Sequence, residues 1–129
     1  MAYTKTIEGP VVAEIAGRRH LSWTITEGGV TASDSFELPG LPLFFTLTLF
    51  EALLETAGTA STISPVVSLD SQDGLDEVAS TAEAGTYIRN DCPVPVFSPR
   101  ANLHVMSTPD TGTATKIVTR ISIVEGHMA

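Results

Sequence analysis

Hydrophobic and polar residues alternate along much of this chain with the two-residue period of a β-strand, most clearly over residues 113–124. The positions that share one face there are Thr115, Ile117, Thr119, Ile121 and Ile123. β-Branched side chains pack well on a pleated surface, while the opposite face alternates lysine, valine, arginine and serine. We therefore predict a strand with one face in a core and the other toward solvent or a partner.

The same period predicts strands over residues 11–15 and 19–26. Gly28-Gly29 can supply the positive φ angles of a tight turn, and the alternation resumes from Val30 to Leu38. The pattern therefore predicts a hairpin over residues 19–38. It ends at residues 39–42, because the two prolines there cannot donate ladder hydrogen bonds.

Residues 43–50 alternate leucine and phenylalanine with threonine, which favours a strand. Residues 51–57 contain good helix formers, so either a helical turn or a continuation of the strand can follow. Residues 60–69 resume an extended pattern, in which Pro65 indicates a sheet edge or a bulge.

Residues 70–84 carry acidic side chains among serine, alanine and glycine, with few large apolar residues to fix them. We expect a long exposed loop there, which makes this segment a candidate for contacts. Short strands are expected over residues 86–89, 94–97 and 103–107, and a tight turn at residues 109–112 leads into the last strand.

About seven to nine short strands without long helices predict an all-β fold, an antiparallel β-sandwich of jelly-roll-like form. The chain has 129 residues, 43% of them hydrophobic, which suits one domain with its own core. We place this domain at residues 10–126, after a flexible N-terminal arm over residues 1–9 and before a C-terminal tail over residues 127–129.

The charge balance narrows the choice of partners. The chain has seven lysines and arginines and fifteen aspartates and glutamates, which gives a net charge of −8. Nucleic-acid affinity comes mainly from basic side chains that displace counterions, so we expect no nucleic-acid partner. The N-terminus lacks the apolar core of a signal peptide, and no apolar run is long enough to cross a bilayer. These features favour folding in a cytoplasm with no membrane partner.

The residues that could carry chemistry are scattered. His20, His104 and His127 lack the paired spacing of metal ligands, so we expect no metal. Cys92 has no histidine or basic residue beside it to stabilise a thiolate, and a small buried hydrophobe is the simpler interpretation. No nucleophile elbow, phosphate loop or dinucleotide fingerprint occurs, so we expect neither a cofactor nor an enzyme.

Three further functions are less favoured by the sequence. The aspartates of residues 70–84 lack the full calcium-loop pattern and favour a solvated loop. A glycosidase needs two carboxylates, and nothing selects a pair among Glu14, Asp34 and Glu37. Trp23 could stack on a sugar, but it alternates with other apolar residues, which favours the core.

Three threonine-, alanine- and glycine-rich segments carry a family resemblance: residues 27–33, 56–62 and 112–126. With them the chain resembles small virion structural proteins of tailed bacteriophages, in particular capsid decoration or cement proteins. The resemblance implies a noncatalytic protein, made in the host cytoplasm and located in the virion, that binds the major capsid protein or other virion proteins. It also implies a homo-oligomer, commonly a trimer, that reinforces the assembled head.

The polar segments without a strand pattern are the candidate surfaces for such contacts, because extended arms can pair with a neighbour's sheet edge. The candidate partner contacts are Tyr3, Lys5, Ile7, Asp70, Asp73, Asp76 and Glu77. Deletion of residues 1–9 is expected to abolish particle binding and leave the monomer folded. The alternatives are a tail or neck component, a carbohydrate- or receptor-binding sandwich module, and a small hydrolase.

Overall fold

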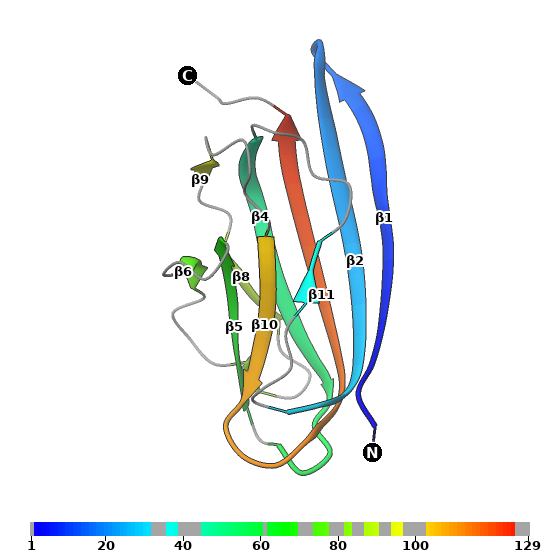
Figure 1. Cartoon of the computed structure of the whole chain (residues 1–129), viewed down its shortest axis with the longest axis vertical. Coiled ribbons are helices and arrows are strands. Elements are labelled where there is room, and N and C mark those ends of the chain that lie inside the picture. The colour runs from blue at the N-terminus through cyan, green and yellow to red at the C-terminus, as the bar shows by residue number, and fades with distance from the viewer. Residues whose placement is uncertain are drawn as a thin grey trace.

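The computed structural model describes residues 2–31, 36–38, 45–60, 62–69, 74–77, 82–83, 87–90, 94–96 and 103–125. Within these ranges the chain forms strands and no helix (Figure 1). The strands are β1 (Thr4–Ile15), β2 (Arg18–Val30), β3 (Phe36–Glu37), β4 (Phe45–Thr56), β5 (Thr62–Leu69), β6 (Gly74–Glu77), β7 (Ala82–Glu83), β8 (Tyr87–Asn90), β9 (Val94–Val96), β10 (Leu103–Pro109) and β11 (Ala114–Glu125).

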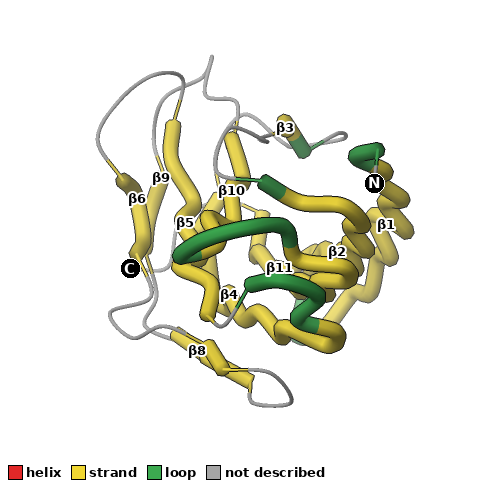
Figure 2. The backbone as a smooth tube through the Cα atoms, turned by 90° about the horizontal axis from the view of Figure 1, so that it is seen from below, coloured by secondary structure: helices red, strands yellow, loops and turns green. Residues whose placement is uncertain are grey.

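The strands form two antiparallel sheets that pack face to face (Figure 2). The larger sheet has the order β1-β2-β11-β4-β8, and β9 also pairs with β4. The smaller sheet has the order β3-β10-β5-β6, and β7 also pairs with β5. The chain is therefore an all-β antiparallel sandwich of jelly-roll-like form, as the strand pattern predicts.

The core lies between the sheets and is built from alternate residues of β2, β4 and β11. Trp23 on β2 is 1% exposed, which confirms its place in the core, and Phe50 on β4 is fully buried. On β11 the predicted inward face is confirmed, since Ile117, Ile121 and Ile123 have no exposed surface. Burial of a side chain of this size contributes roughly 1.5–3 kcal/mol, so these three strands supply much of the stability.

The predicted hairpin over residues 19–38 is wrong. β2 continues through Gly28 and Gly29 to Val30, and its neighbours are β1 and β11. A Cβ on Gly28 would lie 2.7 Å from Oγ1 of Thr4, so β1 approaches this glycine closely and a larger residue would displace the threonine side chain. The reversal occurs earlier, between β1 and β2, at Ala16-Gly17, where φ is 53° and 78°.

The predicted arm over residues 1–9 also differs from the structure, because residues 4–9 belong to β1. Thr4 to Glu8 lie opposite Gly28 to Thr24 on β2, and after a register shift Val11 lies opposite Ser22. The boundary expected between residues 9 and 10 is therefore an irregularity inside one long strand.

The ambiguous segment after residue 50 continues as a strand. β4 extends to Thr56 because Ala52 and Leu54 are buried in the core and the strand pairs with β11, which outweighs local helix propensity. Pro65 lies in β5 between the residues that pair with β7 and those that pair with β6. A proline is tolerated at such a gap in the ladder.

The long loop expected over residues 70–84 contains two short strands. β6 and β7 both pair with β5 and extend the smaller sheet. Acidic residues and glycine are uncommon in strands, so local sequence favoured a loop, and pairing with an existing strand prevailed. Residues 70–73 and 78–81 lie outside the described residues.

Candidate functional site

The described residues contain no group of three or more histidine, cysteine, aspartate or glutamate side chains that could hold a metal ion. His20 lies on β2 of the larger sheet and His104 on β10 of the smaller one, while His127 and Cys92 lie outside the described residues. In the part of the chain that the structure covers, no helix is long and apolar enough to cross a membrane.

The carboxylates considered for glycoside hydrolysis are separated by the fold. Glu14 lies on β1 at the edge of the larger sheet, and Glu37 lies on β3 at the edge of the smaller sheet. Both residues are exposed, and Asp34 lies outside the described residues. The strand order therefore assigns the two described carboxylates to different layers of the sandwich.

The outer face of the larger sheet, the face turned away from the smaller sheet, carries ion pairs between neighbouring strands. Arg120 on β11 contacts Glu51 on β4 at 3.3 Å, and Lys116 contacts Glu55 at 3.2 Å. Most of these side chains are well exposed, and exposed pairs contribute little to stability. This arrangement fixes charge along β11 and β4, and Thr24 of β2 lies opposite Arg120 on the other side of β11.

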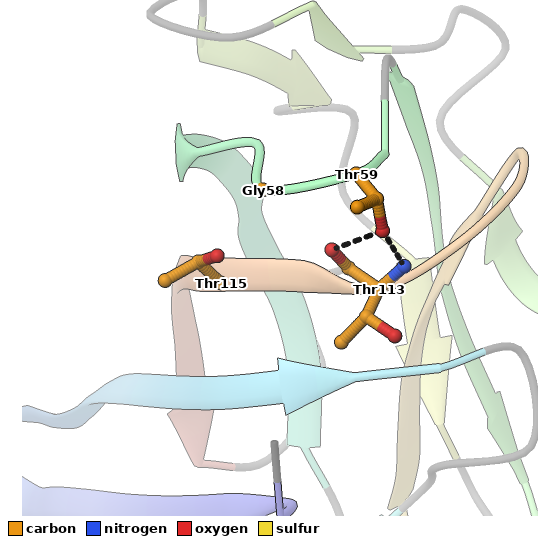
Figure 3. Close-up of a pocket in the computed structure, with 4 residues that line it drawn as sticks. All are labelled: Gly58, Thr59, Thr113 and Thr115. Atoms are coloured by element: carbon orange, nitrogen blue, oxygen red, sulfur yellow. Dashed lines mark hydrogen bonds between the residues drawn. The ribbon is translucent and has the colours of Figure 1, made fainter.

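A shallow depression at one end of the sandwich is lined by Gly58, Thr59, Thr113 and Thr115, and has a volume of about 290 Å³ (Figure 3). It forms where the turn between β4 and β5 meets the turn between β10 and β11. The four residues bring hydroxyl and backbone groups to the depression and no ionisable side chain.

Hydrogen bonds across the depression hold the two turns together. The amide of Thr113 donates to Oγ1 of Thr59 at 2.8 Å, and this hydroxyl donates back to the carbonyl of Thr113 at 3.4 Å (Figure 3). The amide of Thr59 donates to the same carbonyl at 3.1 Å. Nearby, the amide of Thr62 donates to Oδ1 of Asp110 at 3.1 Å. Thr59 therefore serves the fold, and the other side-chain hydroxyls at the depression are those of Thr113 and Thr115.

A second surface is the end of the β1–β2 hairpin. Residues 11–19 are all exposed, and β11 pairs with β2 only as far as His20. We call residues 11–19 the hairpin arm. In Figure 1 the tip of the arm reaches beyond the neighbouring strands of the larger sheet. Arg19 contacts Glu125 at 2.8 Å, which fastens the base of the arm to the end of β11.

The hairpin arm exposes large apolar side chains on both of its faces. Val11 is 64% exposed, Val12 48% and Ile15 58%. Val11 and Val12 are consecutive in the strand and lie opposite Ser22 and Leu21, so they point to opposite faces. Apolar side chains in these positions contribute little to the fold of their own chain, and clustered exposed apolar residues mark interaction surfaces.

The sequence did not single out the apolar residues of the arm, because an apolar run was interpreted as an ordinary strand. The signal that could have found them is the lack of alternation in Val11-Val12-Ala13 followed by a short turn at Ala16-Gly17. β1 is the edge strand of the larger sheet, and consecutive apolar residues on an edge strand remain exposed where no second layer covers them.

Of the N-terminal residues proposed as partner contacts, Tyr3 and Ile7 are half-buried against their own sandwich, and Lys5 is exposed. The Tyr3 hydroxyl donates to Oε2 of Glu27 at 2.8 Å, Lys5 lies opposite Glu27, and Ile7 lies half-buried opposite Ile25. These contacts give the segment a role in the fold, and its role as a partner surface stays a prediction.

The acidic residues proposed as contacts are only partly described. Asp76 and Glu77 lie on β6 opposite Val67 and Val66, at the edge of the smaller sheet. Asp70 and Asp73 lie outside the described residues. The contact role of all four stays a prediction.

No protein-family model and no curated protein matches the chain. Among solved structures, it is similar to the N-terminal CBM22-1 and GH10 modules of endo-1,4-β-D-xylanase 10B from Clostridium thermocellum in complex with xylohexaose. The match has 13% identity and a TM-score of 0.43, and it covers 97% of this chain and 26% of the other. A variant of a family 29 carbohydrate-binding module matches with 13% identity and a TM-score of 0.27, over 95% of this chain and 80% of the other. The likeness is one of sandwich architecture only.

Proposed function

We propose that this chain is a noncatalytic virion structural protein of a bacteriophage, a capsid decoration or cement protein that attaches to the assembled head as a homo-oligomer. The observation that carries the proposal is the exposure of Val11, Val12 and Ile15 on the hairpin arm. The resemblance of the threonine-, alanine- and glycine-rich segments to such proteins supports the choice of partner.

Binding would reinforce the head by mass action. A protein that binds only the assembled lattice lowers the free energy of that lattice relative to free subunits. Each apolar side chain of the arm, when buried, contributes about 1–2 kcal/mol, given that roughly half of its surface is exposed beforehand. One contact of this size contributes little binding free energy, and the contributions add up when many copies bind one particle.

Cosedimentation tests this function. Purified protein is mixed with assembled heads stripped of accessory proteins, and separately with unassembled major capsid protein. We expect binding to assembled heads, higher resistance of these heads to heat, and little binding to free subunits. Equal binding to both forms, or no binding to heads, contradicts the proposal.

A matched pair of variants tests the surface. The triple change Val11→Thr, Val12→Thr and Ile15→Thr keeps β-branched shape and removes apolar surface, so we expect it to reduce head binding at least tenfold. Val118→Thr makes the same chemical change on β11, outside the arm, and should bind as the unmodified protein does. Undiminished binding of the triple variant rules out the arm as the attachment surface.

A second candidate function is carbohydrate or receptor binding, which the threonine-lined depression favours. The hydroxyls of Thr113 and Thr115 flank a volume of about 290 Å³, close to the lower limit of small-molecule sites. Titration with neutral mono- and disaccharides tests this role. Binding that is lost in the Thr113→Val and Thr115→Val double variant supports it, and an absence of heat or spectral change at millimolar sugar contradicts it.

A further inference from the structure

We infer that the hairpin arm of one copy pairs with that of a second copy, through residues 11–15 of β1 arranged antiparallel about a two-fold axis at Ala13. This pairing rests on the proposed function, because both treat the hairpin arm as a docking surface. It adds that the partner of this surface is a second copy of the same chain.

The free edge of β1 provides the template for such pairing. Among the described strands β1 pairs only with β2, and it is the end strand of the larger sheet. A strand in this position presents a row of backbone donors and acceptors to any extended chain beside it. Proteins often protect such edges with lysine, proline or a bulge, and here Pro10 and the register shift lie just before residue 11. The five residues after the shift carry no lysine or proline.

The apolar residues match across the proposed axis. In this register Val11 of one copy lies opposite Ile15 of the second, and Ala13 lies opposite Ala13. Residues directly opposite in an antiparallel pair share a face. Val11, Ala13 and Ile15 all lie on the outer face, because their partners on β2 are Ser22, His20 and Arg18. The two copies therefore form one continuous apolar strip on the outer face, from side chains that are 64% and 58% exposed in the single chain.

Neighbouring registers are less favourable. An axis at Glu14 would place two carboxylates directly opposite one another, which is destabilising in a sheet. An axis at Val12 would place Pro10, which has no amide hydrogen, opposite Glu14 and would bring the irregular part of β1 into the ladder. With the axis at Ala13, each Glu14 lies opposite Val12 of the second copy.

The pairing ends where both chains leave the regular strand. Beyond Val11 the first copy has Gly9-Pro10 and the register shift, and beyond Ile15 the second copy turns at Ala16-Gly17 onto its own β2, where Arg18 lies opposite Ile15. The register shift and the turn therefore limit the pairing to residues 11–15 of each copy.

The size of the contact sets its strength. Five residues of strand edge on each copy bury less than the roughly 1,200–2,000 Å² of a stable interface, so we expect a weak dimer in free solution. Copies held side by side on a lattice have a high effective concentration, at which such a contact persists. The contact is two-fold and therefore differs from the three-fold contact of the trimer that the family resemblance implies.

Disulfide trapping tests the pairing without any particle. Ala13→Cys places two thiols directly opposite across the axis, within the Cα separation that disulfides require. In a glutathione redox buffer we expect a covalent dimer whose linked peptide joins position 13 to position 13, as mapped by mass spectrometry. Thr6→Cys, on the same strand and outer face but before the register shift, serves as the control and should stay monomeric.

Further variants and outcomes decide the inference. Adding Val11→Lys and Ile15→Lys to Ala13→Cys should reduce the covalent dimer at least tenfold, and circular dichroism checks that the fold is retained. Equal cross-linking at positions 13 and 6, no link at position 13 in folded protein, or trimers as the main species overturns the pairing. If the protein binds heads but the disulfide between the two positions 13 does not form, only the pairing is refuted. If that disulfide forms but the protein does not bind heads, only the proposed function is refuted.

Discussion

The Tyr3 hydroxyl donates a 2.8 Å hydrogen bond to Oε2 of Glu27, a side chain with no exposed surface. The two residues are 24 positions apart, and Lys5 lies opposite Glu27 in the β1–β2 ladder. Tyr3 also packs against a cluster of buried residues that includes Val30 and Leu54. The first residues of the chain therefore close one end of the sandwich and satisfy part of a buried carboxylate.

Tyr3→Phe should destabilise the protein by about 1.5–3 kcal/mol, because it removes a hydrogen bond to a buried charged group and keeps the ring packing. Urea unfolding followed by tryptophan fluorescence measures the change. The same substitution in a Glu27→Gln background should have a smaller effect, since a neutral amide oxygen loses less when its donor is removed. Equal effects in the two backgrounds would show that the bond does not involve the carboxylate charge.

Deletion of residues 1–9 should destabilise the fold, whereas the expectation from sequence is that the monomer stays folded. The deletion removes Tyr3 and Ile7 and exposes Glu27 and Ile25, which are both fully buried in the intact chain. Loss of half of β1 and of these contacts should lower the melting temperature by more than 10 °C for a domain of this size. A melting temperature within 2 °C of the intact chain would indicate that residues 4–9 are not held to β2. For this reason the arm variants test particle binding more cleanly than the deletion does.

Gly58→Ala should cost about 2–4 kcal/mol. Gly58 has a φ of 62°, and a Cβ there would contact Oγ1 of Thr115 and lie 2.7 Å from the carbonyl oxygen of Thr113. Gly17→Ala is the matched control, because Gly17 has a φ of 78° with open space around it. That control should cost about 1–2 kcal/mol, which is the backbone term alone. The difference between the two variants in chemical denaturation gives the cost of crowding the two turns, and no difference would mean that the turns move apart freely.

The sequence predicts the sandwich well because burial against a second layer imposes a two-residue period on β2 and β11. It predicts the connections between strands poorly where a glycine can belong either to a turn or to a closely packed strand. Gly28-Gly29 resembles a turn in sequence, but it lies inside β2, where Thr4 approaches Gly28 closely, and the turn forms at Ala16-Gly17. Strand pairing partners, and therefore the free edge of β1, depend on contacts between residues distant in sequence, which local periodicity does not encode.

The same limit applies to the candidate surfaces. Val11 and Val12 have the composition of a core strand, and they stay exposed because β1 is the edge strand of the larger sheet. Thr59 and Thr113 are unremarkable threonines in sequence, and two distant turns bring them together. The inward face of β11 is the opposite case, because the alternation within that one segment is enough to predict which residues are buried.

Thr119→Val should stabilise the protein by about 1 kcal/mol. The Thr119 side chain is fully buried, and within the described residues its Oγ1 has no hydrogen-bond partner. Replacing an unpaired buried hydroxyl by a methyl group of the same shape removes its desolvation cost. Thr48→Val is the control, because Oγ1 of Thr48 donates to the carbonyl of Ser122 at 3.1 Å. The Thr48→Val variant should lose about 0.5–1.5 kcal/mol of stability. Destabilisation by Thr119→Val would show that a bound water or another group forms a hydrogen bond with the Thr119 hydroxyl.

The triple change Val11→Thr, Val12→Thr and Ile15→Thr should leave the free energy of unfolding within about 1 kcal/mol of the unmodified chain. The three side chains are largely exposed, and threonine retains a strong preference for strands. Ile25→Thr makes the same kind of change at a fully buried position of the adjacent strand and should cost several kcal/mol, since it creates a cavity and buries a hydroxyl. Urea unfolding of both variants separates docking from folding. A loss of more than about 2 kcal/mol in the triple variant would mean that the arm packs on its own chain, and the reason for treating it as a docking surface would be gone.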